Sequence, residues 1–370
     1  MNLVELGRLR IRHLAKIHAT TGVVALWLVS AGAAAWACGT VTPPPAPRET
    51  TFEELFEFVD EVEIVGSVAL SLTSAFDVHV SPAYVYVTLP RANRLYAFTR
   101  DGGFVERIGG EGPGPGEFEM PYTSTTDRAG NLYVNDYRQR KVLVFNKHHE
   151  FVRDFVYQGQ GQRLLLADDQ GDDVRLATVG LVGETLIQVY NSHGAGAGPF
   201  EAMGTDWPYR AWAVNVAPDG AFYIVNRVQQ DVHRFSPRGR LLQTLHLVSP
   251  TLHRFTGYDL ATPRKRTRED AVGAVRKLQS EKHTRIESLV ALQDLILVGV
   301  RRYQFEAGVP ERAIDVYDRG GQLIYYGMSS PGKMSKFRSD QAIYFVEIDD
   351  HGDNYGVVTL RRYRLRAEGR

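Results

Sequence analysis

The sequence predicts an all-β fold, a β-propeller of six blades, from three observations. An aromatic residue ends a strand at intervals of 45–47 residues, with one longer interval of 82; these residues are Phe98, Phe145, Tyr190, Phe235, Tyr317 and Tyr363. Short runs of alternating apolar and polar residues precede them, as in half-buried strands. Turns rich in Gly and Asp separate the runs. Four-stranded units with a period of roughly 40–50 residues are typical of a β-propeller.

Composition supports a folded chain and excludes several other classes. Of the 370 residues, 44% are hydrophobic, which is too many for a disordered chain. The single Cys excludes a disulfide-rich scaffold and a Cys-based zinc site. The 43 basic and 43 acidic residues give zero net charge, whereas a DNA-binding domain is normally basic.

Residues 1–37 have the features of a secretory signal. Basic residues come first, an uncharged run covers 23–37, and Ala35-Trp36-Ala37 then provides small residues for signal peptidase. Cys38 follows directly, so the segment resembles a bacterial lipoprotein signal and predicts lipidation of Cys38. Ala35 and Trp36 depart from that pattern, which leaves open an ordinary cleavage with a free Cys38, or an uncleaved anchor. Without residues 1–37 the chain carries 39 basic and 42 acidic residues.

Residues 38–60 are predicted to form a flexible tether, because the Pro-rich run 42–47 cannot form a helix or a sheet ladder. The propeller is predicted over 61–370, and its blades are assigned to 73–109, 120–157, 164–204, 211–247, 285–330 and 341–368. The last has room for three strands. The strand-like segment 62–70 is therefore expected to complete it and to close the ring.

The long interval places an insertion at 249–284, between blades four and five. Thr267-Arg268-Glu269-Asp270 resembles a capped helix start, which predicts an amphipathic helix over 267–281. The insertion is locally basic. A solvated helix face accounts for this charge, and contact with an anionic lipid headgroup is the alternative.

The repeat around blade two resembles a known family. A Gly-Pro-Gly-rich link over 109–118, Pro121, and the run GNLYVNDYRQRKVLVF over 130–145 are similar to the NHL-type, or TolB-like, repeat of six-bladed propellers. The resemblance is strong in blade two and fair in blades one and four. In the other blades only the strand rhythm and the turn residues remain. It implies a six-bladed fold and does not by itself imply a function.

Candidate ligand-binding residues come from one face of such a propeller. The turns between second and third strands carry Arg in five of the six units, and guanidinium groups bind carboxylate or phosphate through paired hydrogen bonds. Aromatic residues at the starts of inner strands could stack on a sugar or plug the channel. The candidates are Arg91, Asn93, Tyr122, Asp136, Arg138, Arg210, Asn226, Arg227, Arg301 and Asp340.

No catalytic motif, metal site or cofactor is predicted. Of the histidines checked for metal spacing, only His79 is expected on an inner strand, and the pair His148-His149 falls in an outer hairpin turn. Acidic runs at 168–173 and 349–353 resemble calcium loops, although Asp-Gly clusters are also ordinary hairpin turns.

We expect a monomeric, exported binding or scaffold protein of the bacterial cell envelope. It would be held to the membrane through Cys38 and would bind a protein, a glycan or another anionic ligand. The alternative is a propeller enzyme of lyase or hydrolase type that acts on an anionic substrate at the axial face. Some NHL-type propellers bind single-stranded nucleic acid, but an exported protein would not meet that partner.

Overall fold

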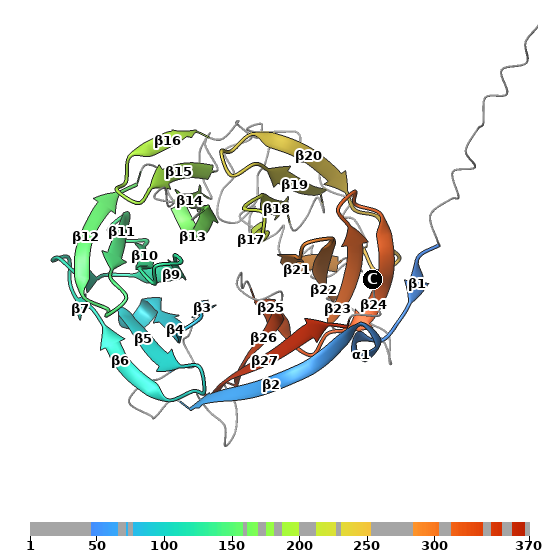
Figure 1. Ribbon diagram of the computed structural model, residues 1–370, viewed down its shortest axis with the longest axis horizontal. Helices are drawn as coiled ribbons and strands as arrows, with labels where there is room; N and C mark the ends of the chain where they lie inside the picture. The colour runs from blue at the N-terminus through green and yellow to red at the C-terminus, as the bar shows by residue number, and fades with distance from the viewer. Residues whose placement is uncertain are drawn as a thin grey trace, which may run out of the picture. The chain divides into compact units, whose positions relative to one another are not determined.

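Six sheets of four or five strands, and one of two strands, make up the computed structural model. The structure describes residues 46–65, 72, 77–157, 161–168, 175–180, 187–199, 212–226, 231–252, 284–302, 312–335, 342–349 and 357–366. Figure 1 shows the six larger sheets around a central axis, with β3, β9, β13, β17, β21 and β25 innermost. The predicted six-bladed propeller is confirmed.

In the first three blades, chain order is also the order from the axis outward. Blade one consists of β3 (Asp77–Val80), β4 (Tyr84–Leu89), β5 (Arg94–Thr99) and β6 (Phe104–Ile108). Blade two consists of β9 (Pro121–Thr126), β10 (Leu132–Asp136), β11 (Lys141–Phe145) and β12 (Phe151–Val156). Blade three consists of β13 (Gly161–Asp168), β14 (Arg175–Gly180), β15 (Ile187–Asn191) and β16 (Gly196–Pro199). The small sheet pairs β7 (Gly110–Glu111) with β8 (Glu117–Phe118) in the link between blades one and two.

Blades four and five keep the same order. Blade four consists of β17 (Trp212–Val216), β18 (Phe222–Asn226), β19 (Asp231–Phe235) and β20 (Leu241–His246). Blade five consists of β21 (Thr284–Ala291), β22 (Leu295–Arg302), β23 (Arg312–Asp318) and β24 (Leu323–Ser329). The predicted helix over 267–281 and most of the insertion lie outside the described residues.

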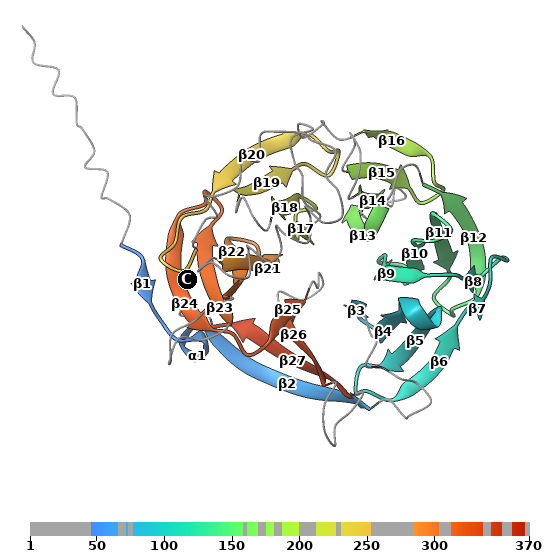
Figure 2. The same cartoon turned by 180° about the vertical axis from the view of Figure 1, so that it is seen from behind.

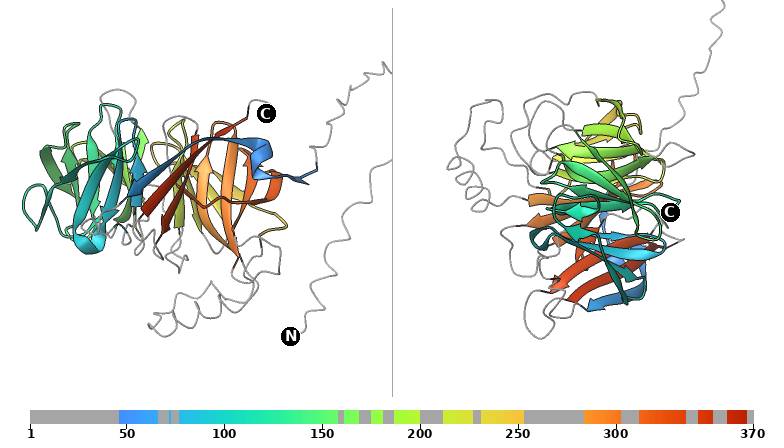
Figure 3. Two further views of the ribbon diagram at one scale, coloured as in Figure 1. Left: turned by 90° about the horizontal axis from the view of Figure 1, so that it is seen from below. Right: turned by 90° about the vertical axis from the view of Figure 1, so that its left-hand side faces the viewer.

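Blade six is closed by the N-terminal part of the chain. Its strands are β25 (Lys333–Ser335), β26 (Ala342–Asp349) and β27 (Val357–Leu365), and β2 (Phe56–Val65) pairs with β27 as the outer strand. Figures 2 and 3 show β2 lying along β27. The expected closure is therefore present, but its strand covers 56–65 rather than 62–70, and the inner strand at 333–335 precedes the predicted blade.

The predicted tether ends earlier than residue 60. β1 (Arg48–Glu49) pairs in parallel with β24 and makes blade five five-stranded, and α1 (Phe52–Leu55) follows it. Phe52, Leu55 and Phe56 are buried together with residues of blades five and six. Their apolar side chains hold this segment against the blades because burial in that shared core removes them from water.

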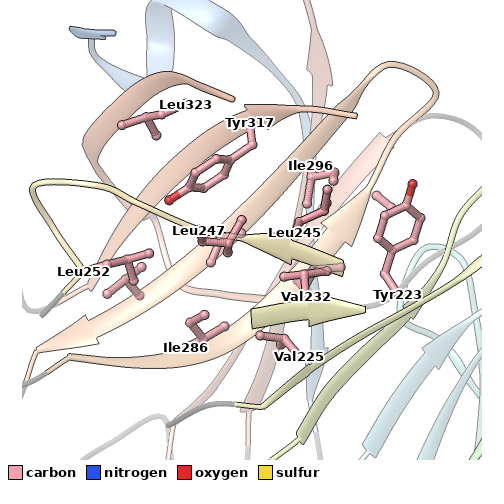
Figure 4. Packing of buried hydrophobic residues seen from close by; sticks show 14 of the residues in the cluster. Tyr223, Val225, Val232, Leu245, Leu247, Leu252, Ile286, Ile296, Tyr317 and Leu323 are labelled. Carbon is pink, nitrogen blue, oxygen red and sulfur yellow. The ribbon is translucent and has the colours of Figure 1, made fainter. Parts of the chain in front are cut away.

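Apolar contacts between neighbouring blades hold the ring together. Figure 4 shows one such cluster, in which Tyr223 and Val232 of blade four pack with Ile286, Ile296 and Tyr317 of blade five. Among the described residues, such clusters join blades one and two, two and three, four and five, five and six, and six and one. This explains why the strands of a blade have apolar residues on both faces.

The turns between third and fourth strands repeat one design. The residue that begins the turn accepts a hydrogen bond from the backbone amide four positions later, as Asn191 does from Ala195 and Asn146 does from Glu150. The fourth residue has a positive φ, which favours glycine. Gly194 occupies it in blade three at φ 83, and an added Cβ would lie 2.4 Å from Phe155 of blade two.

Blade two breaks this rule with His149. Its φ is 61, in the left-handed region that costs a non-glycine residue about 1–2 kcal/mol. The His149 side chain is almost fully buried and contacts Glu106 of blade one. The turn of blade two therefore contacts blade one through the His149 imidazole, whereas the turn of blade three brings its backbone close to blade two.

Candidate functional site

The predicted ligand face consists of the turns between second and third strands and the links that lead to the next inner strand. Both lie at the same end of the blades, because neighbouring antiparallel strands run in opposite directions. The candidates with described side chains are Arg91, Asn93, Tyr122, Asp136, Arg138 and Arg301. Arg210, Arg227, Asp340 and Cys38 lie outside the described residues, and Asn226 is described only by its backbone at the end of β18.

Asp136 is fully buried and holds the start of blade two. Its Oδ2 accepts hydrogen bonds from the backbone amides of Glu119, at 2.7 Å, and Met120, at 3.0 Å. Its Oδ1 accepts from the amides of Arg138 and Gln139, each at 3.0 Å. Because its carboxylate accepts four backbone hydrogen bonds, Asp136 fixes both the incoming link and the turn. Its role at the site is therefore structural.

The link between blades one and two is tied to the turns on either side of it. Asn93 donates from Nδ2 to Oε1 of Glu111 at 3.2 Å. Gln139 donates from Nε2 to the carbonyls of Glu117, at 2.9 Å, and Gly112, at 3.3 Å. The two turns that carry Arg91 and Arg138 therefore flank one link.

Arg91 and Arg138 are both exposed. Arg91 belongs to η2 (Pro90–Ala92), and Arg138 lies in the turn after β10. Among the described residues, neither guanidinium has a hydrogen bond or ion pair. These two cations remain available to an anion.

Two half-buried tyrosines of blade two contact each other next to Arg138. Tyr122 is the second residue of β9, the innermost strand of blade two, and Tyr137 begins the turn that contains Arg138. Their ring centroids are 5.6 Å apart and the rings are inclined by 38°. The sequence placed Tyr122 at an inner strand, but Tyr137 was not among the candidates although it adjoins two of them.

Arg301 is placed differently from the expectation. It lies in β22, opposite Arg312 in β23, rather than in the turn between them. Its Nη1 is 3.4 Å from Oε1 of Glu287, and Nε of Arg312 is 3.0 Å from the other oxygen of that carboxylate. One carboxylate thus forms ion pairs with both arginines.

The arginines expected in the turn of blade six also lie within a strand. Arg361 and Arg362 belong to β27 and form ion pairs with Glu61 and Asp60 of β2. Arg361 also pairs with Glu347 of β26 at 2.7 Å. These contacts join the closing strand to its blade. Burial lowers the pKa of Arg362, and its bonds to Asp60 raise it, with a net increase.

A repeated tyrosine joins neighbouring blades near the opposite face. Tyr86, Tyr223 and Tyr344 occupy the same position in second strands. Arg100 donates to the Tyr344 hydroxyl at 2.8 Å, and Arg319 donates to that of Tyr223 at 2.6 Å. In each case the arginine comes from the turn between third and fourth strands of the next blade.

His149 takes the corresponding role in blade two. Its Nε2 is 3.0 Å from the Tyr86 hydroxyl, and its Nδ1 is 2.7 Å from Oε1 of Glu106. With the proton on Nδ1, the ring donates to Glu106 and accepts from Tyr86. Burial raises the pKa of Tyr86, so its hydroxyl stays protonated. The sequence shows the repeated tyrosine, but not the partner that the next blade supplies.

His79 lies on the innermost strand of blade one, as predicted. Its Nε2 is 3.0 Å from the Thr126 hydroxyl of blade two. Within the part of the chain that the structure describes, no three His, Cys, Asp or Glu residues are grouped to hold a metal ion. Most of the two calcium-like runs lies outside that part.

Comparison with known proteins supports the fold. A family described as a 6-bladed beta-propeller, DUF5128, matches residues 55–161. No curated protein matches the chain. Among the described residues, no helix is long and apolar enough to cross a membrane.

Solved structures give the same result over most of the chain. A protein of Bacteroides fragilis described as exported has a TM-score of 0.62 and 12% identity, and the match covers 86% of this chain and 99% of that one. A DUF4221 family member from Bacteroides vulgatus has a TM-score of 0.55 and 9% identity, over 84% and 98%. A streptogramin B lyase has a TM-score of 0.51 and 12% identity, over 85% and 99%. At these identities the likeness is one of fold alone.

Proposed function

We propose that the protein is a non-catalytic binding propeller of the bacterial cell envelope that holds an anionic ligand at the face of blades one and two. The observation that supports this most directly is the pair Arg91 and Arg138. Both guanidinium groups are exposed, flank one link, and have no ion-pair partner among the described residues. Planar guanidinium groups suit carboxylate or phosphate because they donate two parallel hydrogen bonds.

Structural roles of the neighbouring polar groups favour binding over catalysis. Asp136 is occupied by backbone amides, and Asn93 by Glu111. Burial raises the pKa of Tyr157, whose hydroxyl is 3.5 Å from the Asp136 carbonyl. That hydroxyl stays protonated and cannot serve as a base there.

Anchoring through Cys38 is the second part of the proposal. Nine residues separate Cys38 from Arg48, where β1 begins, and a fully extended chain of that length spans at most about 35 Å. A lipid on Cys38 would hold the rim of blade five close to the membrane.

Ligand binding is tested with the purified full chain and an array of anions and glycans, at low and moderate salt. We expect at least one anionic ligand whose affinity falls about tenfold in the Arg91→Gln/Arg138→Gln double variant. Arg238→Gln is the matched control, because Arg238 is exposed in a turn at the opposite end of blade four. Equal binding by the double variant and the control would contradict the proposed ligand face.

Anchoring is tested by fractionating bacteria that express the full chain or Cys38→Ala. We expect the wild-type chain in the membrane fraction, with an acyl label on the protein. The variant should be released after signal cleavage. A Cys38→Ala chain that remains membrane-bound after cleavage would refute lipid anchoring.

The lyase or hydrolase alternative gains no support from the described residues. One structural neighbour is a streptogramin B lyase, but 12% identity shows only the fold. The histidine on the inner strand, His79, uses its Nε2 in a contact with Thr126. Chemical conversion of any ligand identified on the array would support the enzyme alternative.

A further inference from the structure

The face of blades one and two contains an aromatic surface as well as cations. The ring centroids of Tyr122 and Tyr137 are 5.6 Å apart, and both residues are half-buried. We call them the blade-two aromatic pair. Arg138 follows Tyr137 directly in the chain and is exposed. An aromatic surface made of two inclined rings therefore adjoins a positive charge.

The backbone beneath this pair is held in place from two blades. The Tyr137 amide donates to the Met120 carbonyl at 2.9 Å, which fixes the turn against the start of the inner strand. The Tyr122 carbonyl accepts from the Thr88 hydroxyl of blade one at 3.2 Å. Asp136 fixes the rest of the turn. Tyrosines on a rigid backbone lose little conformational entropy when a ligand binds, so they make effective contact surfaces.

Charges of both signs lie on this face. Arg91 and Arg138 are the exposed cations, and the link carries Glu111, which is exposed, and Glu119, which is half-exposed. A polyanion such as single-stranded nucleic acid would meet repulsion from these carboxylates. A ligand with one carboxylate and several hydroxyls suits the mixture, because hydroxyls donate to carboxylates and a carboxylate accepts from guanidinium.

We infer that this site binds a carboxylate-bearing pyranose, a uronic acid unit of a polysaccharide. The apolar face of the sugar ring packs on the blade-two aromatic pair, its carboxylate pairs with Arg138, and its hydroxyls donate to Glu119. The inference rests on the proposed function and narrows it, from an anion of any kind to an acidic sugar.

The test measures affinities of the full chain in detergent for four kinds of probe. The first is a panel of galacturonic, glucuronic and mannuronic acid tetramers, and the second is their methyl esters. The third is inorganic phosphate, and the fourth is a single-stranded oligonucleotide. We expect at least one acid tetramer to bind ten times or more tighter than its ester, which keeps the ring and lacks the charge. A panel in which no acid is preferred over its ester, or in which an oligonucleotide binds tighter than every acid, would overturn the inference.

Variants separate the aromatic contribution from the charge. Tyr137→Leu should weaken binding of the acid tetramer at least tenfold and leave phosphate binding within twofold. Tyr137→Phe, which keeps the ring, should bind the tetramer within threefold of the wild-type chain. Arg138→Gln should weaken both ligands, and Arg238→Gln neither. A thermal melt of each variant shows that it is folded.

The outcomes distinguish the two proposals. If Arg138→Gln weakens phosphate binding but Tyr137→Leu has no effect on any tetramer, the anion face stands and the acidic-sugar inference fails. If Tyr137→Leu weakens phosphate and tetramer equally, the tyrosine has only a structural role and the inference fails again. If the wild-type chain binds no anion at all, both proposals fail.

Discussion

Replacing Asp136 with alanine is expected to destabilise the protein by about 2–4 kcal/mol. The substitution removes the acceptor for the amides of Glu119, Met120, Arg138 and Gln139. A buried donor without a partner costs about 1–3 kcal/mol. The two turn amides can be rehydrated because the turn carries exposed side chains, so two unpartnered donors give about 2–6 kcal/mol. Relief of the desolvation cost of a buried carboxylate moves the value to the lower half of that range.

Equilibrium unfolding in urea, followed by circular dichroism, measures this loss. Asp136→Asn keeps one acceptor oxygen and should cost about half as much as Asp136→Ala. Asp294→Ala is the control, since Asp294 is an exposed turn carboxylate and such substitutions stay within about 0.5 kcal/mol. An Asp136→Ala protein within about 1 kcal/mol of the wild type would refute the assignment of Asp136 as the support of this turn.

Three further predictions use the same measurement. Phe52→Ala should lower the free energy of unfolding by about 3–5 kcal/mol, because Phe52 is 2% exposed and its ring centroid is 5.3 Å from that of Phe345. A decrease under 1 kcal/mol would show that the segment around Phe52 is not held against blades five and six. His149→Gly relieves about 1–2 kcal/mol of backbone strain, but it leaves the buried Tyr86 hydroxyl without its partner, at about 1–3 kcal/mol, and removes the contact with Glu106. We therefore expect a net loss of up to about 2 kcal/mol, and a gain would show that backbone strain dominates. Burial lowers the pKa of His233 below 6.5, so the unfolded chain binds a proton at this residue more readily than the folded state and the free energy of unfolding should fall as the pH drops below 6.5. His233→Asn should make the free energy of unfolding less dependent on pH between 6.5 and 5. An unchanged pH dependence would rule out His233 as its source.

The blade framework could be predicted because it depends on local pattern. Alternating strands and their turns recur with the aromatic at the end of each third strand, and Phe98, Phe145 and Phe235 are all buried there. Each of these features is visible within a few residues of sequence. The number of blades follows from counting them.

The closing strand was misplaced because its pairing depends on residues far along the chain. The run 57–61 is rich in acidic residues, so it resembled a tether rather than a strand. In the structure Asp60 and Glu61 lie beside Arg362 and Arg361, and these opposite charges stabilise the pair. Only the known register reveals that complementarity.

The candidate site was partly predictable, because some of its residues follow from the local repeat and others depend on contacts between distant segments. Exposed turn arginines such as Arg91 and Arg138 follow from the repeat, since a turn residue keeps its place in each blade. The neutralisation of Arg301 by Glu287 is a contact across one blade, and the pairing of Tyr122 with Tyr137 depends on how a link meets a turn. Such side-chain contacts require the three-dimensional arrangement.

The closure of blade six also sets the order of events during synthesis. Glu61 in β2 and its partner Arg361 in β27 are 300 positions apart in the sequence. At about 5–20 residues per second, a ribosome needs roughly 15–60 s to produce the second strand after the first. During that time β2 has no partner and the ring is open. A pause, a truncation or early folding before β27 arrives would leave β2 and β26 with unpaired edges, and unpaired edges favour aggregation.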